Sequence, residues 1–391
     1  MNYKLALNLL KKRNIDAWLI YQSQGTYSVG MNPIASEICE ITELVTRPWF
    51  CLLKSNLKQP IWIYQSMESD KLDNVIGKKL AYSSRASLIS ILSSYLPSRG
   101  TIAMEVSTKA NIPLLSRIDF GTVQLIKSLT KAKIVSSQDL LGELTSRWGR
   151  SGLNSHKEAV RKLILILDET KLLIRSKIGN ITDYQIQKYI ESRYTHYELL
   201  SIYHPVVASG KNTGNPHYFP SIEQPVIIKE NVILLIDIWG KVNNPNSIYA
   251  DITTMYYTGK TIPKKVSCAW NALIDTRNAV IKYLQTNIKN RMIKGSSLDN
   301  IARNIIKKAG YEKYFIHRLG HNISSELHGY GPNLDNYETL DNRNLLFDSG
   351  YSIEPGIYTP KFGLRSEINI YISKTGTVTV TTPAPLEIET I

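Results

Sequence analysis

The amino-acid sequence predicts two domains, an α/β domain over residues 1–150 and an α+β domain over residues 151–391. In the first part of the chain helices alternate with strands, which is typical of an α/β domain. In the second part, long helical stretches alternate with pairs of strands joined by short turns, which favours antiparallel hairpins packed against helices. At 391 residues the chain is also long for a single hydrophobic core.

The first domain is predicted from short elements and contains few residues typical of a catalytic site. The expected helices are residues 3–13 and 86–96, and the expected strands are residues 16–21, 49–54, 60–65 and 101–106.

A domain boundary is predicted near residues 148–152. Beyond it, Ser155 is expected to be the N-cap of a long helix that ends near Lys177, with Glu158 as the acid of a capping box. Gly310 is expected to end the last helix in a left-handed conformation. The further helices are predicted at residues 182–194, 264–290 and 297–309.

The distribution of charged and apolar residues limits the class of protein that this sequence can encode. The net charge of +14 would permit nucleic-acid binding, but Lys and Arg are spread along the chain and no nucleic-acid-binding motif accompanies them. The chain has no run of 18 or more apolar residues, and the apolar stretch near its start is too short for a signal peptide. We therefore expect a cytoplasmic protein without nucleic-acid or membrane partners.

Cys39, Cys51 and Cys268 lie in apolar neighbourhoods and are expected to be buried thiols.

Two aspartates lie in segments where an ordinary surface charge would not be expected. Asp237 interrupts a continuous apolar stretch, residues 232–239, that is predicted to be a buried strand. An unpaired carboxylate is costly there, so Asp237 needs a partner. Asp251 lies in the next predicted strand, and the Asn-rich stretch 241–246 predicts a turn between two antiparallel strands. We expect the two acids to lie side by side, although a lone strand Asp is more commonly a cap, a turn residue or half of an ion pair.

Two glutamates repeat this arrangement near the C-terminus. Glu354 and Glu367 lie in two further predicted strands between residues 351 and 371, and each strand carries one inward acid. Cross-strand pairing with Arg365 or Lys361 would account for Glu367. It accounts poorly for Glu354, which has no basic residue nearby in the sequence.

The histidines give an independent indication of a site. Three of the seven histidines, His317, His321 and His328, fall together within residues 315–329, and His217 follows a proline. A neutral imidazole can ligate a metal, and a neighbouring one can donate a proton or a hydrogen bond to a reaction intermediate. Taken alone, His317 would more simply be a core residue with satisfied hydrogen bonds.

Together these acids and one histidine form an oxygen-rich set of ligands with a single nitrogen. Such a set suits a pair of divalent ions better than a structural zinc ion, with Mn²⁺ expected first and Co²⁺ or Zn²⁺ as alternatives. The sequence therefore predicts metal-assisted hydrolysis, with five side chains converging on one pocket: Asp237, Asp251, His321, Glu354 and Glu367.

The ordered set, with Gly320-His321, the stretch 353–358 and Arg365-Ser366-Glu367, resembles the pita-bread metallopeptidases. These include Xaa-Pro aminopeptidase, prolidase and methionine aminopeptidase, and the resemblance covers about residues 155–391. It implies a pita-bread catalytic domain that follows the N-terminal α/β domain.

The resemblance also implies a role for each metal ligand. Asp251 and Glu367 would bridge two ions, Asp237 would complete one ion's site, and His321 with Glu354 would complete the other. The expected reaction uses a hydroxide shared by the two ions to attack the peptide carbonyl.

Five residues are expected to take part in catalysis. The resemblance matches His217 and His328 to two histidines that bind substrate and intermediate, and His317 to a further active-site histidine of the Xaa-Pro branch. Glu354 is expected to take the proton of the attacking water, and Arg365 to orient Glu367.

The N-terminal domain narrows the expected substrate. It resembles, weakly by residue, the first domain of creatinase and prolidase, and methionine aminopeptidase generally lacks such a domain. The expected substrate is therefore a short peptide cleaved at an Xaa-Pro bond. The expected assembly is a homodimer, as is common among relatives. Two alternatives are a pita-bread protein that binds without catalysis, which would not need the complete ligand set, and a creatinase-like hydrolase of a small non-peptide amide or amidine.

The chain departs from the family pattern at three places. The loop 241–246 between the two aspartates is slightly long, which a hairpin absorbs at small cost. Gly329 follows the last histidine where the usual residue is Glu, which bears on substrate preference. Thr254 stands where many relatives carry Arg, and this is expected to remove a contact behind the metal ligands.

Overall fold

The structure is a computed structural model that describes residues 2–23, 32–41 and 45–391, so residues 1, 24–31 and 42–44 of the predicted first domain lie outside the described part. The chain divides into two compact units, Met1–Leu144 and Thr145–Ile391. Within the described ranges, every helix falls short of the length and apolar character that a membrane crossing requires.

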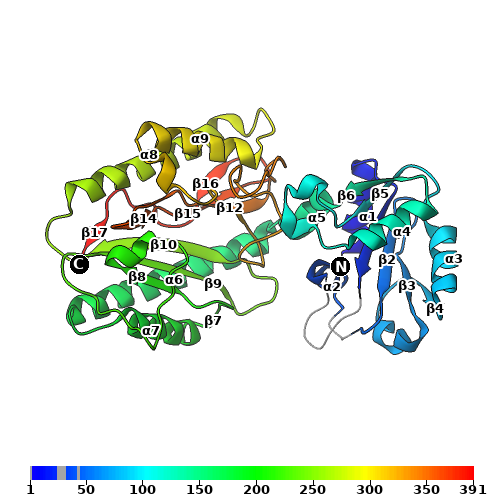
Figure 1. The fold of residues 1–391 in the computed structure, drawn as a ribbon, viewed down its shortest axis with the longest axis horizontal. Helices are drawn as coiled ribbons and strands as arrows, with labels where there is room; N and C mark the ends of the chain where they lie inside the picture. Colours follow the sequence, from blue (N-terminus) through cyan, green and yellow to red (C-terminus); the bar gives the residue numbers. More distant parts are fainter. Residues whose placement is uncertain (1, 24–31, 42–44) are drawn as a thin grey trace. The chain divides into compact units, whose positions relative to one another are not determined.

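The first unit is built around one mixed sheet (Figure 1), whose strand order among the described residues is β4-β3-β2-β1-β5-β6. The three central strands β1, β2 and β3 pair antiparallel, whereas β4, β5 and β6 join the sheet in parallel. The strands are β1 Ala17–Gln22, β2 Trp49–Lys54, β3 Ile61–Gln65, β4 Lys78–Tyr82, β5 Thr101–Met104 and β6 Lys133–Ser136; the helices are α1 Tyr3–Lys12, α2 Pro33–Cys39, α3 Arg85–Tyr95, α4 Phe120–Leu129 and α5 Gln138–Thr145.

The sequence predicted α1, α3, β1, β2, β3 and β5 close to their observed bounds. It did not place β4 or β6, which have exposed or half-buried faces and therefore lack the apolar runs of the central strands.

The second unit holds two main sheets between two layers of helices, with one long and one shorter helix in each layer. Its helices are α6 Gly149–Lys177, α7 Asp183–His196, α8 Lys264–Asn287 and α9 Gly295–Lys308. Its strands are β7 Leu199–Leu200, β8 Val206–Ser209, β9 Ile233–Val242, β10 Ala250–Tyr257, β11 Asn322–Ile323, β12 Ser349–Ile353, β13 Gly356–Tyr358, β14 Gly363–Arg365, β15 Ile368–Ile372, β16 Val378–Val380 and β17 Glu389–Thr390.

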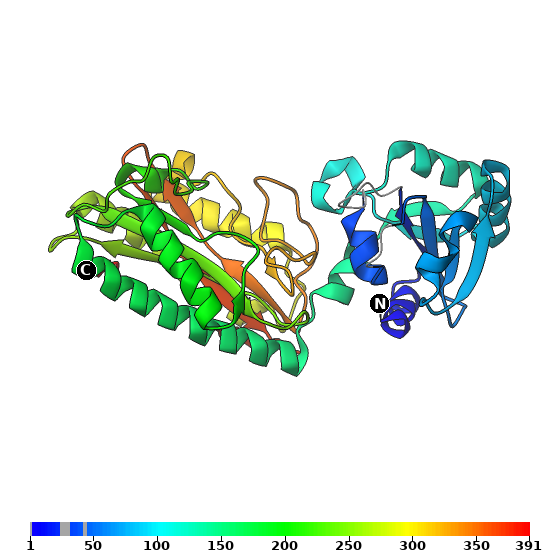
Figure 2. The ribbon, with the colours of Figure 1, turned by 90° about the horizontal axis from the view of Figure 1, so that it is seen from below.

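Helices α6 and α7 cover one face of the β9–β10 sheet (Figures 1 and 2). The residues of β9 alternate between the two faces, as a strand requires. Ile236 and Ile238 pack with α6 and α7, whereas Leu235 and Trp239 belong to the core on the other side. Asp237 shares the parity of Leu235 and Trp239, so it faces the interior between the two sheets.

Three local expectations about the second unit have clear outcomes. Helix α6 begins at Gly149, so Ser155 is not its N-cap; instead the Ser155 hydroxyl accepts from Ile248 N–H at 3.1 Å and ties the helix to the β9–β10 hairpin. Gly310 has φ of +84°, as predicted. Cys268 is exposed on α8, so only Cys39 and Cys51 are buried thiols as expected.

Glu105 is a carboxyl buried at the end of β5, with 0 % of its surface exposed. Its Oε1 accepts from Trp18 Nε1 at 2.6 Å and from Ser137 Oγ at 3.2 Å. Its Oε2 finds no hydrogen-bond partner among the described residues. Burial raises the pKa of this carboxyl to about 7, although both hydrogen bonds oppose the rise.

We predict that Glu105→Gln changes how stability depends on pH. The folded-state pKa lies above the unfolded value of about 4.3, so the wild-type chain loses stability as pH rises from about 4.5 to about 7, by roughly 3 kcal/mol in total. Gln does not titrate and keeps an acceptor for Trp18. The variant's unfolding free energy relative to wild type should therefore grow over this pH range and then level off, as measured by urea unfolding followed by tryptophan fluorescence. A pH-independent difference would contradict the prediction.

Candidate metal centre

The β9–β10 hairpin presents two acids on one face of its sheet. The register pairs Asp237 with Thr253 and Asp251 with Trp239. Asp237 and Asp251 are therefore diagonal neighbours on one face of the sheet, and neither is directly opposite the other. Both side chains are buried, with 8 % and 5 % of their surfaces exposed.

The second pair of acids lies where the chain passes between two sheets. Glu354 directly follows β12 and Glu367 directly precedes β15, and the register pairs the adjoining residues Ile353 and Ile368. Between the two acids the chain forms the β13–β14 hairpin. This crossover places Glu354 and Glu367 at neighbouring positions of the interior.

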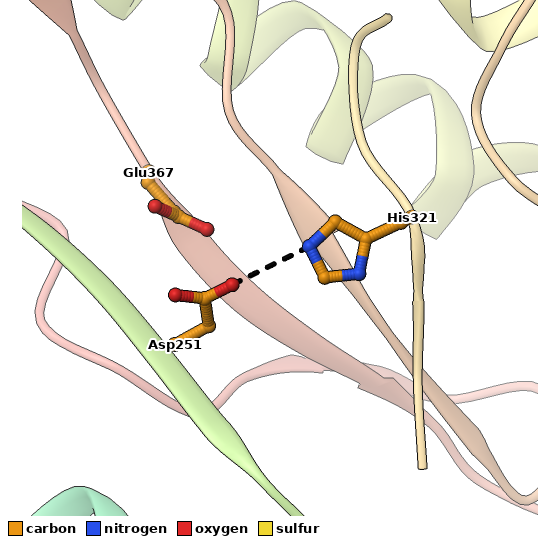
Figure 3. A group of neighbouring side chains, drawn as sticks. All are labelled: Asp251, His321 and Glu367. Carbon is orange, nitrogen blue, oxygen red and sulfur yellow. Dashed lines mark ion pairs between the residues drawn. The ribbon is translucent and has the colours of Figure 1, made fainter. Parts of the chain in front are cut away.

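His321 joins the two pairs of acids. Its Nε2 lies 3.3 Å from Asp251 Oδ2 and 3.5 Å from Glu354 Oε1. Figure 3 shows the side chains of Asp251, His321 and Glu367 directed toward one another, and one ligand atom from each lies within 4.8 Å of the others. The other ring nitrogen of His321, Nδ1, lies 3.2 Å from the Asn322 carbonyl oxygen. If Nδ1 donates there, the lone pair of Nε2 is directed toward the acids.

Thr253 and Arg365 connect the first aspartate to the last glutamate. The Thr253 hydroxyl lies 3.0 Å from Asp237 Oδ1 and 2.6 Å from Glu367 Oε2, and it accepts from Arg365 Nε at 2.7 Å. The guanidinium forms a close ion pair with Asp237, whereas Glu367 Oε2 lies 3.8 Å from Arg365 Nε. Arg365 was expected to orient Glu367, and the structure gives Asp237 as its closer partner.

Electrostatics in the pocket are unfavourable without a further positive charge. Burial, then the charges of Asp237 and Glu354, raises the pKa of Asp251 well above its usual range. Burial, then the charges of Asp251 and Glu354, does the same to the pKa of Glu367. Burial lowers the pKa of His321 to about 4, so this imidazole is neutral near pH 7.

The donor set fits divalent cations. Asp251 Oδ1 and Glu367 Oε1 are buried and have no hydrogen-bond partner in the described part of the chain. Buried oxygens left without donors cost free energy, which a cation between them would offset. The neutral nitrogen of His321 adds the ligand type that Mn²⁺, Co²⁺ and Zn²⁺ accept together with carboxylates.

The remaining predicted histidines differ in their surroundings. His328 is exposed, and its ring lies edge-to-face with His321, with centroids 4.4 Å apart. His317 is half-buried, its Nε2 lies 2.9 Å from the Tyr358 hydroxyl, and burial lowers its pKa to about 4. His217 is exposed in the segment after η4 (Gly210–Gly214), and its backbone N–H donates to Asn215 Oδ1.

Two departures from the family pattern have a steric explanation. Thr254 has the same parity as Ile252 and Tyr256, which pack on the α6 and α7 side, so it faces away from the acids. Thr254 therefore makes no contact with the acids from this face, and the expected loss of a contact relative to Arg stays a prediction. At Gly329, a Cβ atom would press against Asn322 Oδ1 and lie 2.8 Å from Ser324 Oγ, so a larger residue does not fit there.

Sequence reasoning missed Thr253, Tyr358 and Ser352. Ser352 Oγ donates to Glu354 Oε1 at 3.0 Å and accepts from His321 N–H at 2.9 Å. Thr253 was detectable, because it lies two residues after Asp251 on the same strand face. Ser352 likewise lies two residues before Glu354, whereas its contact with His321 and the contact of Tyr358 with His317 join separate segments and leave no pattern in the sequence.

Buried acids and one neutral histidine between two sheets form a candidate site for divalent metal ions. The chain belongs to metallopeptidase family M24, whose sequence profile matches residues 154–374. The architecture is the pita-bread fold preceded by an N-terminal domain, as the resemblance implied.

Known proteins similar to the chain carry consistent names. The Xaa-Pro dipeptidase of Lactobacillus helveticus is 32% identical over 210 residues, which cover 53% of this chain and 50% of that protein. The chain spans about half the length of the curated relatives it matches. A Pyrococcus horikoshii dipeptidase structure has a TM-score of 0.68 at 22% identity and covers 100% of both chains. A Thermotoga maritima X-Pro aminopeptidase structure has a TM-score of 0.66 at 20% identity and covers 100% of this chain and 99% of that one. At these identities the two structures establish the fold alone.

We predict that Glu367→Ala and His328→Ala separate metal binding from turnover. Removing the Glu367 carboxylate deletes a buried oxygen that is available to a metal ion. The purified variant should therefore contain at least one ion fewer per chain and have no hydrolytic activity. Removing the exposed His328 ring should leave metal content near that of wild type and lower turnover by about 10²-fold or more. Elemental analysis of the metal content of both purified variants tests whether each residue is a metal ligand. Equal metal loss in the two variants would make His328 a ligand.

Proposed function

We propose that this chain is a metal-dependent peptidase that hydrolyses the Xaa-Pro bond of short peptides. The observation that carries the proposal is a set of three buried carboxylates, the half-buried Glu354 and one neutral imidazole. In this set Asp251 and Glu367 each keep an oxygen without a donor among the described residues. The names of the Xaa-Pro dipeptidases of Lactobacillus helveticus and Pyrococcus furiosus, to which the chain is similar in sequence, suggest the substrate class. A protein that only binds peptides would not need this costly set.

The proposed cofactor is a pair of divalent ions, with Mn²⁺ expected first and Co²⁺ or Zn²⁺ as alternatives. Asp251 and Glu367 would contact both ions, as the family resemblance implies, and each carries one buried oxygen without a hydrogen-bond partner among the described residues. Asp237 would complete one site, and His321 with Glu354 the other. When bound, the ions supply a lowered pKa for water and polarisation of the substrate carbonyl.

Two residues are placed to move protons or stabilise charge. The Glu354 side chain is 14% exposed, and its Oε1 is held by the Ser352 hydroxyl at 3.0 Å. Its other oxygen is proposed to take the proton of the attacking water and to pass it to the leaving nitrogen. His328 is exposed beside His321, and it is proposed to donate a hydrogen bond to the oxyanion that forms on the carbonyl.

Three further residues have supporting roles in the proposal. Arg365 pairs with Asp237 and contacts Thr253, which fixes the first aspartate. His317 is hydrogen-bonded to Tyr358, and it is proposed to border the substrate pocket. His217 is proposed to contact the substrate, because the family resemblance matches it to a substrate-binding histidine and its side chain is exposed. A homodimer in the cytoplasm remains the expected assembly and location.

We predict preferential cleavage before proline. Metal-loaded protein should hydrolyse Ala-Pro or Ala-Pro-Ala with a kcat/KM at least about tenfold above that for Ala-Ala or Ala-Ala-Ala. The tertiary amide of proline lacks an N–H, so a pocket built for it leaves the N–H of an Ala peptide unpaired. Amino-acid release measured with Mn²⁺, Co²⁺ and Zn²⁺ tests this.

The matched control for this assay is Glu354→Gln, which keeps the size of the side chain and removes its basicity. It should lower kcat by about 10²-fold or more for the proline peptide. Equal or faster cleavage of the Ala peptides would refute proline specificity and leave a general metallopeptidase. An unchanged kcat in the control would refute the role of Glu354.

A further inference from the structure

The loop that carries His328 consists of residues with little intrinsic order. Gly329 and Gly331 flank Tyr330 immediately after His328. Glycine loses more conformational freedom on folding than other residues, so such a segment needs outside support to hold one conformation. An imidazole that must meet a developing oxyanion has to be held to within a fraction of an ångström.

Asn322 supplies that support from the strand β11, and it is completely buried. Its backbone carbonyl accepts from Gly329 N–H at 2.9 Å, and its side-chain Oδ1 accepts from Gly331 N–H at 3.1 Å. Its Nδ2 donates to Ser349 Oγ and to the Gly350 carbonyl, both at 3.0 Å. Asn322 therefore joins the segment 328–331 to β12. Its two donor contacts and one acceptor contact identify which terminal atom of the side-chain amide is the nitrogen and which is the oxygen.

A buried guanidinium holds the opposite side of the same loop. Arg343 donates to the Tyr330 carbonyl at 2.6 Å and to the Gly331 carbonyl at 2.7 Å. Asp341 neutralises it in an ion pair of 2.6 Å. Carbonyls are thus held by Arg343 and N–H groups by Asn322, which leaves the backbone after His328 little freedom.

The side chain of Asn322 also accounts for both glycines. A Cβ atom at Gly331 would lie 2.5 Å from Asn322 Cγ, and a Cβ atom at Gly329 would press against Asn322 Oδ1. Neither glycine has a positive φ among those described, so backbone conformation does not demand glycine at these positions. The requirement comes from nearby side chains, namely the Asn322 amide at both glycines together with Ser324 at Gly329 and Ser146 at Gly331.

We propose that Asn322 is a positioning residue that holds His328 in the place where it acts on the substrate. It also fixes one partner of the metal centre, because its carbonyl lies 3.2 Å from His321 Nδ1. The kinetic consequence rests on the proposed function. The structural claim, that the amide side chain sets the position of the His328 ring, stands on the contacts alone.

The test is a double-mutant cycle between Asn322→Ala and Gly329→Ala in zinc-loaded protein. Each single variant should lower kcat by about tenfold to 10²-fold with metal content unchanged, because each displaces the loop. Gly329→Ala should cost less kcat in the Asn322→Ala background than in wild type, because removing the amide relieves the tightest contact of the added methyl group. Effects that multiply in the double variant would overturn the proposal.

A spectroscopic measurement separates positioning from mere loss of stability. The His328 imidazole resonance, assigned with His328→Gln, reports its edge-to-face contact with His321 by ring-current shift and needs no hydrolysis. It should move in Asn322→Ala and stay unchanged in Asn32→Ala, which removes an equally buried asparagine of the first unit. An unmoved resonance in Asn322→Ala overturns the proposal. Unmoved kcat with a moved resonance overturns only the catalytic role of His328.

Discussion

The structure of the second unit depends on keeping four carboxylates in one buried pocket. If all four are ionised, the ion pair of Arg365 with Asp237 leaves a net charge of −4 + 1 = −3. Removing such a group from water costs several kcal/mol per ion unless countercharges are present. Two divalent cations would more than neutralise it. The sheets, hairpins and helices around the pocket provide the rigid frame that holds like charges at this distance.

Two neutral hydroxyl side chains hold the acids of the pocket in defined positions. Thr253 stands between Asp237 and Glu367, and Ser352 stands between His321 and Glu354. Each hydroxyl has one proton and two lone pairs, so it can link a donor to an acceptor without adding charge. The arrangement holds the ligand oxygens apart and leaves others free for cations.

Much of the fold was predictable because its signals are local. The apolar run around Asp237 and the turn residues after it predicted the β9–β10 hairpin, and Gly310 predicted the end of α9. The start of α6 was misplaced, because Ser155 is a residue type typical of an N-cap. Its hydroxyl instead accepts a hydrogen bond from the backbone N–H of Ile248, which is far away in sequence. Short strands with little apolar character, such as β4 and β6, carried too weak a pattern to be found.

The sequence by itself determined the kinds of ligand, their order along the chain and the family to which they belong. Only the tertiary structure decided which atoms meet. Register made Thr253, rather than Asp251, the direct partner of Asp237, and the crossover after β12 brought Glu354 beside Glu367. The position of Asn322 against Gly329 also depends on folding. The reason is physical: residue type and periodicity are local properties, whereas strand register and contacts between separate segments are set only when the sheets form and close over a common interior.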